Sequence, residues 1–491
     1  MDELMKLTLQ NLPNLSADVR VPTYAREGLS AGIVHIGLGN FHRAHQAWYL
    51  HRLMDMGLAH TWAILGAGVR AADAAQRDRL LAQDCLTTLI ELGPDAKSAE
   101  VTGAMIGFIP VAADNAPLIA HMSEAAIRIV ALTVTEGGYY QSMAGGFDAA
   151  HPDIVFDASN PTAPKTAFGA IVAALRARRD AGVGPFTCQS CDNLQGNGDV
   201  LRQTVVGLAG LSDPDLAAWI DAHVTFPNSM VDCIVPATGP KELALATTFG
   251  IDDAAPVTHE NFRQWVIEDK FCAGRPDWDK AGATLTNDVH AYEAMKLRVL
   301  NAGHQIIATP GELLSIETIA GTMAHPLILD VFRKIEMEEI VPHVCGVPGR
   351  TPEAYAALIE RRLSNAAIHD TTRRVAFDGS SRHPGFLHPI IRDAIATDTA
   401  LDGLILIEAL WARMCFGTRE DGSDIAPNDP FWEALNGAAV VARDDPQAWL
   451  FQRQFYGDLG DDARVSASFA RWLRLIWAEG TEAALRSYLD I

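Results

Sequence analysis

The chain has 491 residues, which exceeds the length at which one hydrophobic core stops growing, so two domains are expected. Hydrophobic residues make up 48% of the chain and charged residues 20%, which is an ordinary globular composition. The net charge of −22 disfavours nucleic acid and anionic membranes as partners, because both bind basic surfaces, and no apolar run is long enough to span a bilayer.

The first half of the chain alternates short apolar runs with amphipathic stretches. The predicted strands are Ile33–Ile36, Trp62–Leu65, Thr87–Glu91, Ile129–Thr135, Phe186–Ser190 and Met230–Val235. The predicted helices between them are Ala47–Met56, Asp73–Ala82 and Lys165–Ala181. This alternation favours an α/β fold with a doubly wound parallel sheet of the Rossmann type.

The second half of the chain turns helical after Thr286. Helical periodicity covers Ala291–Ile307, Pro326–Glu339, Pro352–Arg362, Leu401–Arg413 and Ser466–Ala478. We therefore expect a Rossmann-type domain over residues 1–285 and a mostly α-helical domain over residues 286–491, with a cleft between them.

A glycine-rich turn follows the first predicted strand. Gly37 allows a tight turn, and Gly39 lets the backbone approach a pyrophosphate at the start of the next helix. His42 stands where the usual fingerprint has a third glycine, so the motif alone is weak. Asp73 is the candidate ribose ligand, although it lies 36 residues after Gly37 rather than about 20. A carboxylate there favours NAD over NADP, whereas Arg70 nearby could accommodate a 2′-phosphate.

The stretch from Tyr292 to His304 carries polar side chains where a core helix would be apolar. At about 100° per residue, with Lys296 at zero, Glu293 falls near 60°, His304 near 80° and Asn301 near 140°. These four side chains share one side of a regular helix, within an arc of about 140°. A base, an amide donor and an imidazole that converge in this way are what proton removal from an alcohol requires, so we interpret this side as a catalytic face.

Several motifs spread along the chain resemble the polyol-specific long-chain dehydrogenase/reductase family. They are Gly37–His45, Thr133–Tyr139, Ser190–Leu194, Phe226–Asp232, Gln264–Asp269, Gly274–Pro276, the Lys296/Asn301/His304 segment, Arg373–Ser380 and Arg413–Thr418. The last two runs resemble the branch that interconverts D-mannitol and D-fructose with NAD. The resemblance implies a metal-independent monomer that binds a small polyol or ketose. It adds Phe41, Arg43, Thr135 and Glu136 to the cofactor-binding residues Gly37, Gly39 and Asp73.

The catalytic roles follow from the chemistry of a secondary alcohol. Lys296 is the expected general base, and its pKa must fall from about 10.4 toward about 7–8 for work at neutral pH. Asn193 and Asn301 are expected to donate hydrogen bonds to the reacting oxygen. His304 would orient a neighbouring hydroxyl, and Glu293 would stand at the mouth of a proton path. Asp232, Arg374 and Arg382 are the candidate ligands of the substrate hydroxyls.

A metal site is not expected, because the sequence has no clustered Cys/His ligand set. Cys188 and Cys191 have the spacing of half a zinc site but no second pair follows, and His42 and His45 fit structural roles. Tyr292 and Lys296 have the Tyr-x-x-x-Lys spacing of short-chain dehydrogenases, but they lie far from the glycine turn, so Tyr292 is assigned to packing. The seven scattered cysteines indicate reduced thiols, and with no signal peptide expected at the N-terminus they predict a cytoplasmic protein.

Other functions remain open on the sequence. D-arabinitol or sorbitol oxidation and fructuronate or tagaturonate reduction are alternatives within the same family. A catalytically silent dinucleotide-binding sensor is a remote alternative, and the presence of Lys296, Asn193, Asn301 and His304 argues against it.

Overall fold

A computed structural model describes residues 4–142 and 145–490, and for Glu136 it describes the backbone alone. Contacts divide the chain into two compact units, Met1–His290 and Ala291–Ile491, here called unit 1 and unit 2. The expected boundary at residues 285/286 lies a few residues before this division. Each unit is described by itself.

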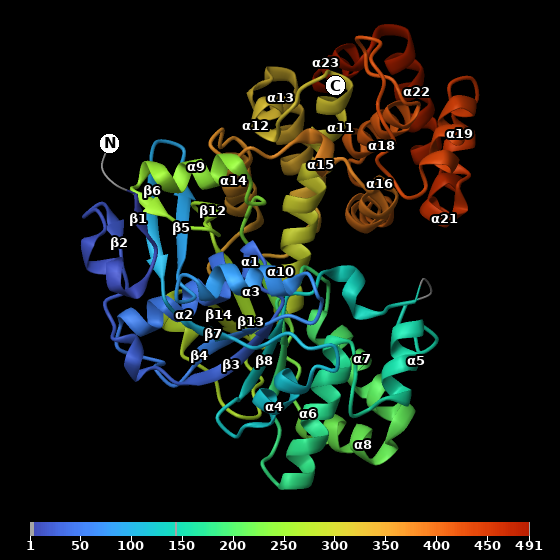
Figure 1. The fold of residues 1–491 in the computed structure, drawn as a ribbon. Helices are drawn as coiled ribbons and strands as arrows, with labels where there is room; N and C mark the ends of the chain where they lie inside the picture. The colour runs from blue at the N-terminus through green and yellow to red at the C-terminus, as the bar shows by residue number, and fades with distance from the viewer. Residues whose placement is uncertain (1–3, 143–144, 491) are drawn as a thin grey trace. The chain divides into compact units, whose positions relative to one another are not determined.

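Unit 1 is built on a five-stranded sheet in the order β7-β4-β3-β8-β9. The strands are β3 (Ala31–Ile36), β4 (Ala63–Ala67), β7 (Met105–Phe108), β8 (Ile129–Leu132) and β9 (Thr187–Ser190). All four pairings are parallel, and β4, β3 and β8 lie side by side (Figure 1). The chain runs outward from β3 in both directions, which is the strand order of a Rossmann sheet. The predicted α/β fold class is confirmed.

Both faces of this sheet are covered by helices. Val34 and Ile36 of β3 pack into a core with α6 (Ala167–Ala181) and α7 (Asn197–Ser212). Ile33 packs on the opposite face with α2 (Gln46–Asp55). Successive strand residues point to opposite faces, so a strand covered on both sides reads as a continuous apolar run.

Two of the predicted strands form but belong to other sheets. The strand predicted at Thr87–Glu91 is β5 (Thr87–Leu92), which pairs antiparallel with β6 (Lys97–Thr102) across a short connection. The strand predicted at Met230–Val235 is β10 (Ser229–Asp232), which pairs antiparallel with β13 (Gln264–Glu268). The further strands of these two sheets are β12 (Val257–Glu260), β2 (Val19–Arg20) and β14 (Thr284–Thr286). Their assignment to the main sheet was wrong, because an apolar run does not reveal its pairing partner.

The regular elements of unit 2 are all helices, among the residues that the structure describes. Helix α11 (Ala302–Leu313) packs against α13 (Pro326–Ile335), α15 (Thr372–Val375) and α18 (Asp402–Cys415). The other long helices are α14 (Pro352–Leu363), α17 (His388–Thr397), α19 (Trp432–Ala442), α22 (Ala463–Glu479) and α23 (Thr481–Leu489). The predicted helices of this half form, with ends that differ by a few residues, but parts of Ala291–Ile307 and Pro326–Glu339 are π-helical.

Three segments of unit 2 are π-helical turns. They are η5 (Lys296–Asn301), η6 (Glu336–Ile340) and η8 (His383–Leu387), and η5 contacts both of the others. The predicted helix Ala291–Ile307 therefore consists of α10 (Val289–Met295), η5 and α11 in succession. The angles computed for a regular helix do not carry across this wider turn, so the predicted arc of about 140° is wrong in detail.

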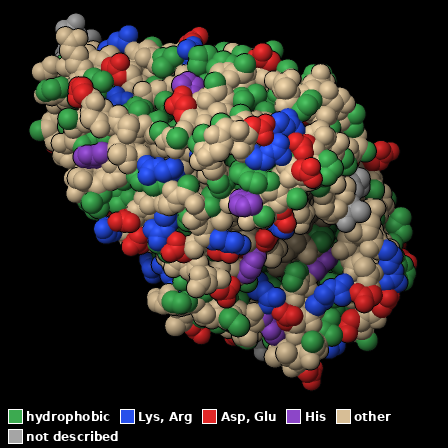
Figure 2. Space-filling model, turned by 90° about the horizontal axis from the view of Figure 1, so that it is seen from below, with side chains coloured by type: hydrophobic (Ala, Val, Ile, Leu, Met, Phe, Trp, Pro, Cys, Tyr) green, Lys and Arg blue, Asp and Glu red, His purple; other side chains and the backbone are tan. Residues whose placement is uncertain are grey.

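The surface and the thiols agree with a charged globular protein. On the face drawn in Figure 2, acidic and basic side chains are interspersed and do not gather into one basic area. All seven cysteines lie in the described residues and are free thiols. Among the described helices, none combines the length and apolarity needed to cross a membrane.

Glu339 should stabilise unit 2 by capping α18 from outside that helix. Its two carboxylate oxygens accept hydrogen bonds of 2.8 Å from the backbone N–H groups of Gly403 and Leu404, and the hydroxyl of Tyr488 donates a third. Replacement by Ala leaves buried donors without acceptors, so Glu339→Ala should lower the free energy of unfolding by about 2–3 kcal/mol. Urea unfolding checks this, with the exposed Glu338→Ala as the matched control. Equal midpoints for the two variants would contradict the role of the cap.

Candidate active site

The glycine turn after β3 fits tightly against the end of β8. Gly37 has φ +93°, and a Cβ on it would lie 2.0 Å from the carbonyl oxygen of Thr133. The hydroxyl of Thr133 in turn donates to the carbonyl of Gly37. A side chain at position 37 would therefore be excluded both by the backbone conformation and by the neighbouring strand.

A cavity of about 580 Å³ opens at the carboxyl ends of β3, β4 and β8, and all its walls belong to unit 1. Its volume lies within the range of small-molecule and cofactor sites. A Cβ on Gly39 would meet no atom within 4 Å, so this glycine leaves open space at the cavity wall. The predicted cofactor residues that line the cavity are Gly37, Gly39, Asp73 and Thr135. The residues present thus fit a dinucleotide at the carboxyl edge of the sheet.

Arg43 and Phe41, two other predicted cofactor residues, are not among the described residues that line the cavity. Arg43 is buried, and its guanidinium donates to the carbonyl of Ala255 and, at 2.8 Å, to the side-chain oxygen of Asn40. Burial lowers the pKa of Arg43 to about 10. Because Asn40 does line the cavity, Arg43 acts on the site through it. Phe41 stacks on His45 at 4.8 Å between ring centroids, and the side chain of Glu136 lies outside the described residues.

Asp73 lines the cavity and also stabilises the loop that precedes it. One of its oxygens accepts hydrogen bonds from the backbone N–H groups of Val69 and Arg70, at 3.0 and 2.9 Å. Arg70 also lines the cavity. The carboxylate therefore fixes the loop at the end of β4, where it borders the space that the predicted ribose would occupy.

A buried polar chain lies under the glycine turn. His35 contacts the hydroxyl of Thr133 at 2.9 Å through one ring nitrogen and the side-chain oxygen of Gln46 at 2.8 Å through the other. Burial lowers the pKa of His35 to about 3, so the ring is neutral. His42, in the position of the missing third glycine, is fully buried and stacks on His35 at 3.4 Å between ring centroids. The turn is thus held by stacked imidazoles.

Asp192 organises the loop after β8, a role that the sequence analysis did not predict. Its carboxylate accepts from the backbone N–H groups of Val134 and Thr135, at 3.0 and 2.9 Å, and from the hydroxyl of Tyr139 at 2.6 Å. Thr135 has φ +70°, an unusual conformation for a residue with a side chain. The acid therefore fixes a strained cavity residue, and it directly precedes Asn193, which is exposed. The motif Thr133–Tyr139 was the available signal for such a partner.

Unit 2 carries the predicted base and its neighbours. Lys296 opens η5 and Asn301 closes it, while Glu293 lies in α10 and His304 in α11. Lys296 is 7% exposed and Glu293 4% exposed, so the amine is not a solvated surface lysine. Tyr292 is buried as well, in keeping with a packing role.

His304 is neutral and lies near charged groups of unit 2. Burial lowers its pKa to about 4, and the charges of Asp370, Arg374 and Arg382 act on it. Among the described residues its Nε2 has no hydrogen-bond partner. Arg374 forms a bidentate ion pair with Asp370, and Arg382 donates to the carbonyl of Val375 at 2.7 Å. The structure thus brings His304, Arg374 and Arg382 into one electrostatic neighbourhood, whereas the third predicted substrate ligand, Asp232, is buried at the end of β10 in unit 1.

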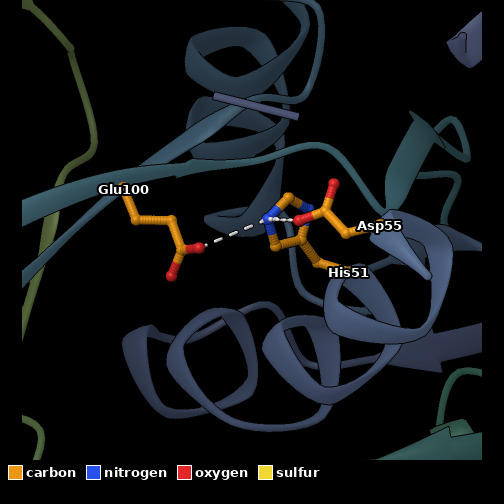
Figure 3. A group of neighbouring side chains, drawn as sticks. All are labelled: His51, Asp55 and Glu100. Atoms are coloured by element: carbon orange, nitrogen blue, oxygen red, sulfur yellow. Dashed lines mark ion pairs between the residues drawn. The ribbon is translucent and has the colours of Figure 1, made fainter. Parts of the chain in front are cut away.

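Among the described residues, one group of three possible metal ligands lies together, and it is far in sequence from the predicted site. His51 and Asp55 of α2 face Glu100 of β6, with the imidazole Nε2 3.3 Å from Asp55 and 3.6 Å from Glu100 (Figure 3). Arg52 pairs with Glu100 at 2.9 Å, and Thr23 donates to Asp55 at 2.8 Å. The carboxylates already accept hydrogen bonds or ion pairs from protein donors, so we interpret this group as a structural polar network.

Asp192→Ala should weaken dinucleotide binding without unfolding unit 1. It removes the acceptor for two backbone N–H groups and the Tyr139 hydroxyl, which frees Thr135 from its strained conformation. Loss of these charge-assisted bonds should raise the Kd for the dinucleotide about 10-fold to 100-fold. Quenching of tryptophan fluorescence measures the Kd, with the exposed Asp215→Ala as the control. A Kd equal to that of the control would refute this role of Asp192.

Comparison with known proteins assigns both halves of the chain. The profile of the mannitol dehydrogenase Rossmann domain matches residues 31–280, and that of the mannitol dehydrogenase C-terminal domain matches residues 288–477. A mannitol 2-dehydrogenase of Cereibacter sphaeroides is 56% identical over 475 residues, covering 97% of this chain and all of the relative. A polyol:NADP oxidoreductase of Gluconobacter oxydans is 39% identical, covering 98% of this chain and 99% of the relative.

Solved structures agree with this assignment. The Pseudomonas fluorescens mannitol 2-dehydrogenase in ternary complex with NAD and D-mannitol is 39% identical, with a TM-score of 0.87 over 99% of this chain and 100% of that chain. A substrate-free D-sorbitol dehydrogenase is 35% identical, with a TM-score of 0.91 over 98% of this chain and 100% of that chain. Since the two matched profiles account for most of the sequence and the relatives align over nearly all of it, the chain belongs to the mannitol dehydrogenase family.

Proposed function

We propose that the protein oxidises D-mannitol to D-fructose with NAD. The observation that carries this proposal is a buried amine, Lys296, on the same π-helical turn as the amide of Asn301. The close relatives named mannitol 2-dehydrogenase, and the neighbour solved with NAD and D-mannitol, supply the substrate and the cofactor.

Lys296 acts as the general base that takes the proton of the reacting hydroxyl. Partial desolvation favours the uncharged amine that this step needs. Asn193 and Asn301 donate hydrogen bonds to the oxygen as it gains negative charge and becomes a carbonyl. Neutral His304 orients a neighbouring hydroxyl, and Glu293 stands on the path that returns the proton to solvent. Bound NAD supplies the hydride acceptor.

The ligands of the remaining hydroxyls are Asp232, Arg374 and Arg382. The bidentate pairing of Arg374 with Asp370 supports an uncharged polyol over a uronate. A guanidinium already matched by a carboxylate has little charge left for a second carboxylate, and the overall charge of −22 adds repulsion. Fructuronate or tagaturonate reduction is therefore the weaker candidate.

The cavity supports NAD as the preferred dinucleotide, with Gly37, Gly39, Asp73 and Thr135 as the residues that hold it. The carboxylate of Asp73 would repel a 2′-phosphate. Arg70 on the same wall is the residue through which NADP would be accommodated, and a relative named polyol:NADP oxidoreductase shows that the family contains such a variant.

The proposal includes a monomeric protein that acts in the cytoplasm. The free state of all seven cysteines, each in the described part of the chain, supports a reducing compartment.

Loss of the base should abolish turnover but leave cofactor binding intact. Lys296→Met should lower kcat about 100-fold to 10,000-fold, the usual contribution of a general base. In the wild type, kcat/KM for mannitol should fall as pH is lowered, because the amine becomes protonated, and fructose reduction should fall as pH is raised. Burial lowers the pKa of His304 to about 4, so the ring stays neutral near neutral pH and does not contribute to the pH profile of either reaction. The measurement is the steady-state kcat of Lys296→Met, compared with that of the exposed control variant Lys97→Met. Comparable kcat in the two variants would eliminate Lys296 as the base.

A substrate panel separates the candidate functions. Initial rates of NAD reduction should be highest with mannitol, lower with arabinitol and sorbitol, and at least about 10-fold lower when NADP replaces NAD. NADH oxidation should proceed with fructose and not with fructuronate. Faster turnover of fructuronate would assign the chain to the uronate branch, and dinucleotide binding without turnover of any polyol would indicate a sensor.

A further inference from the structure

Glu336 is a fully buried acid beside the catalytic segment. It is the first residue of η6, and its side chain is 1% exposed. Within the described residues, neither of its carboxyl oxygens has a hydrogen-bond partner. Burial raises the pKa of Glu336 well above its usual range, because an apolar surrounding disfavours the charged form.

Other buried acids of unit 2 are satisfied by protein donors. Glu339 accepts from two backbone N–H groups and a tyrosine hydroxyl. Glu312 accepts from Arg419 at 2.6 Å. Glu408 lies between His383 and His388, and although burial alone would raise its pKa, these two rings hold it well below the usual range. The state of Glu336 is therefore a local feature and not a general property of this core.

The carboxyl group of Glu336 lies against the backbone of the catalytic helix. A Cβ on Gly303 would be 2.8 Å from Oε1 of Glu336 and 3.1 Å from the ring of Phe332. Gly303 stands between Asn301, which closes η5, and His304. The absence of a side chain at position 303 thus provides the space that the acid occupies.

We propose that Glu336 is a positioning residue of the active site: its buried carboxyl group packs against the backbone at Gly303 and so holds the π-helical turn that carries Lys296 and Asn301. This inference rests on the proposed function of those two residues.

The mechanical consequence is specific to the catalytic segment. A shift of η5 by a fraction of an ångström moves the base and the amide together, and misplacement of about 1 Å can cost 10²-fold in rate. The dinucleotide cavity lies wholly in unit 1 and should not sense this change. A positioning role therefore predicts a fall in kcat with an unchanged Kd for NADH.

The test compares Glu336→Leu with Glu336→Gln in the full-length enzyme. Gln keeps the size and shape of the protonated acid, so its kcat should stay within about 3-fold of wild type, whereas Leu, which is shorter and branched, should lose about 10-fold to 100-fold. Removing an unpartnered buried polar group should leave the unfolding midpoint equal or higher. The exposed Glu338→Leu, two positions along the same turn, is the control. Wild-type kcat in Glu336→Leu would overturn the proposal.

Infrared difference spectroscopy shows whether the buried acid of Glu336 holds its proton, as the raised pKa predicts. The spectrum of wild type minus Glu336→Gln should contain the carbonyl stretch of a protonated carboxylic acid, sensitive to exchange into deuterated water. A carboxylate band in its place would show that the acid is ionised and would overturn the proposal.

Gly303→Ala provides a second variant if Glu336→Leu does not fold. Helix propensity alone predicts that this change stabilises α11 by about 1 kcal/mol, while the contact with Oε1 predicts displacement of the acid and a fall in kcat of about 10-fold or more. Activity equal to wild type would count against the inference. If Lys296→Met retained activity, the proposed function would fail, whereas the infrared band would still report the state of Glu336.

Discussion

The cofactor cavity depends on the contact between the backbone at Gly37 and the carbonyl of Thr133. This contact joins the first and fourth strands of the Rossmann order at their carboxyl ends, where the sheet diverges and a ligand can enter. A tight turn alone would be mobile, but Thr133 also reaches His35 and the carbonyl of Gly37. The buried imidazoles hold the turn from below, so the walls of the cavity are set before any ligand binds.

The carboxylate of Asp192 stabilises another wall of the cavity, the loop after β8. Asp192 ties the loop after β8 to the end of β9 by accepting from Val134, Thr135 and Tyr139. Backbone N–H groups that point at a carboxylate are charge-assisted donors, and they offset the strain of Thr135. Because Asn193 follows directly, one acid orders both a cavity residue and the residue proposed to contact the reacting oxygen.

The sequence predicted four of the five strands of the Rossmann sheet, mainly because β3, β4 and β8 are apolar runs covered on both faces. It missed β7, a short strand at the edge of the sheet. Sequence could not place β5 and β10, since an apolar run looks the same whether it pairs with β3 or with a neighbouring hairpin. The polar side of the Tyr292–His304 stretch was recognised from composition. Its geometry was not, because nothing in the residue pattern distinguishes a π-helical turn from an α-helical one. Arg43 was predicted to bind the cofactor because of its place in the motif. The sequence could not show that Arg43 instead contacts Ala255, because Ala255 lies more than two hundred residues away along the chain.

Two acids of unit 2 lie near the catalytic segment in addition to Glu293: Asp370, whose charge acts on His304, and Glu336, which lies against Gly303. A carboxylate close to Lys296 would favour the ammonium form and remove the basicity that catalysis needs. Asp370 forms an ion pair with Arg374, and burial raises the pKa of Glu336 well above its usual range. The charge of Asp370 is thus balanced by a guanidinium, whereas Glu336 favours its protonated form. A protonated acid carries no negative charge. In that form Glu336 does not favour the ammonium state of Lys296, which must be uncharged to act as a base.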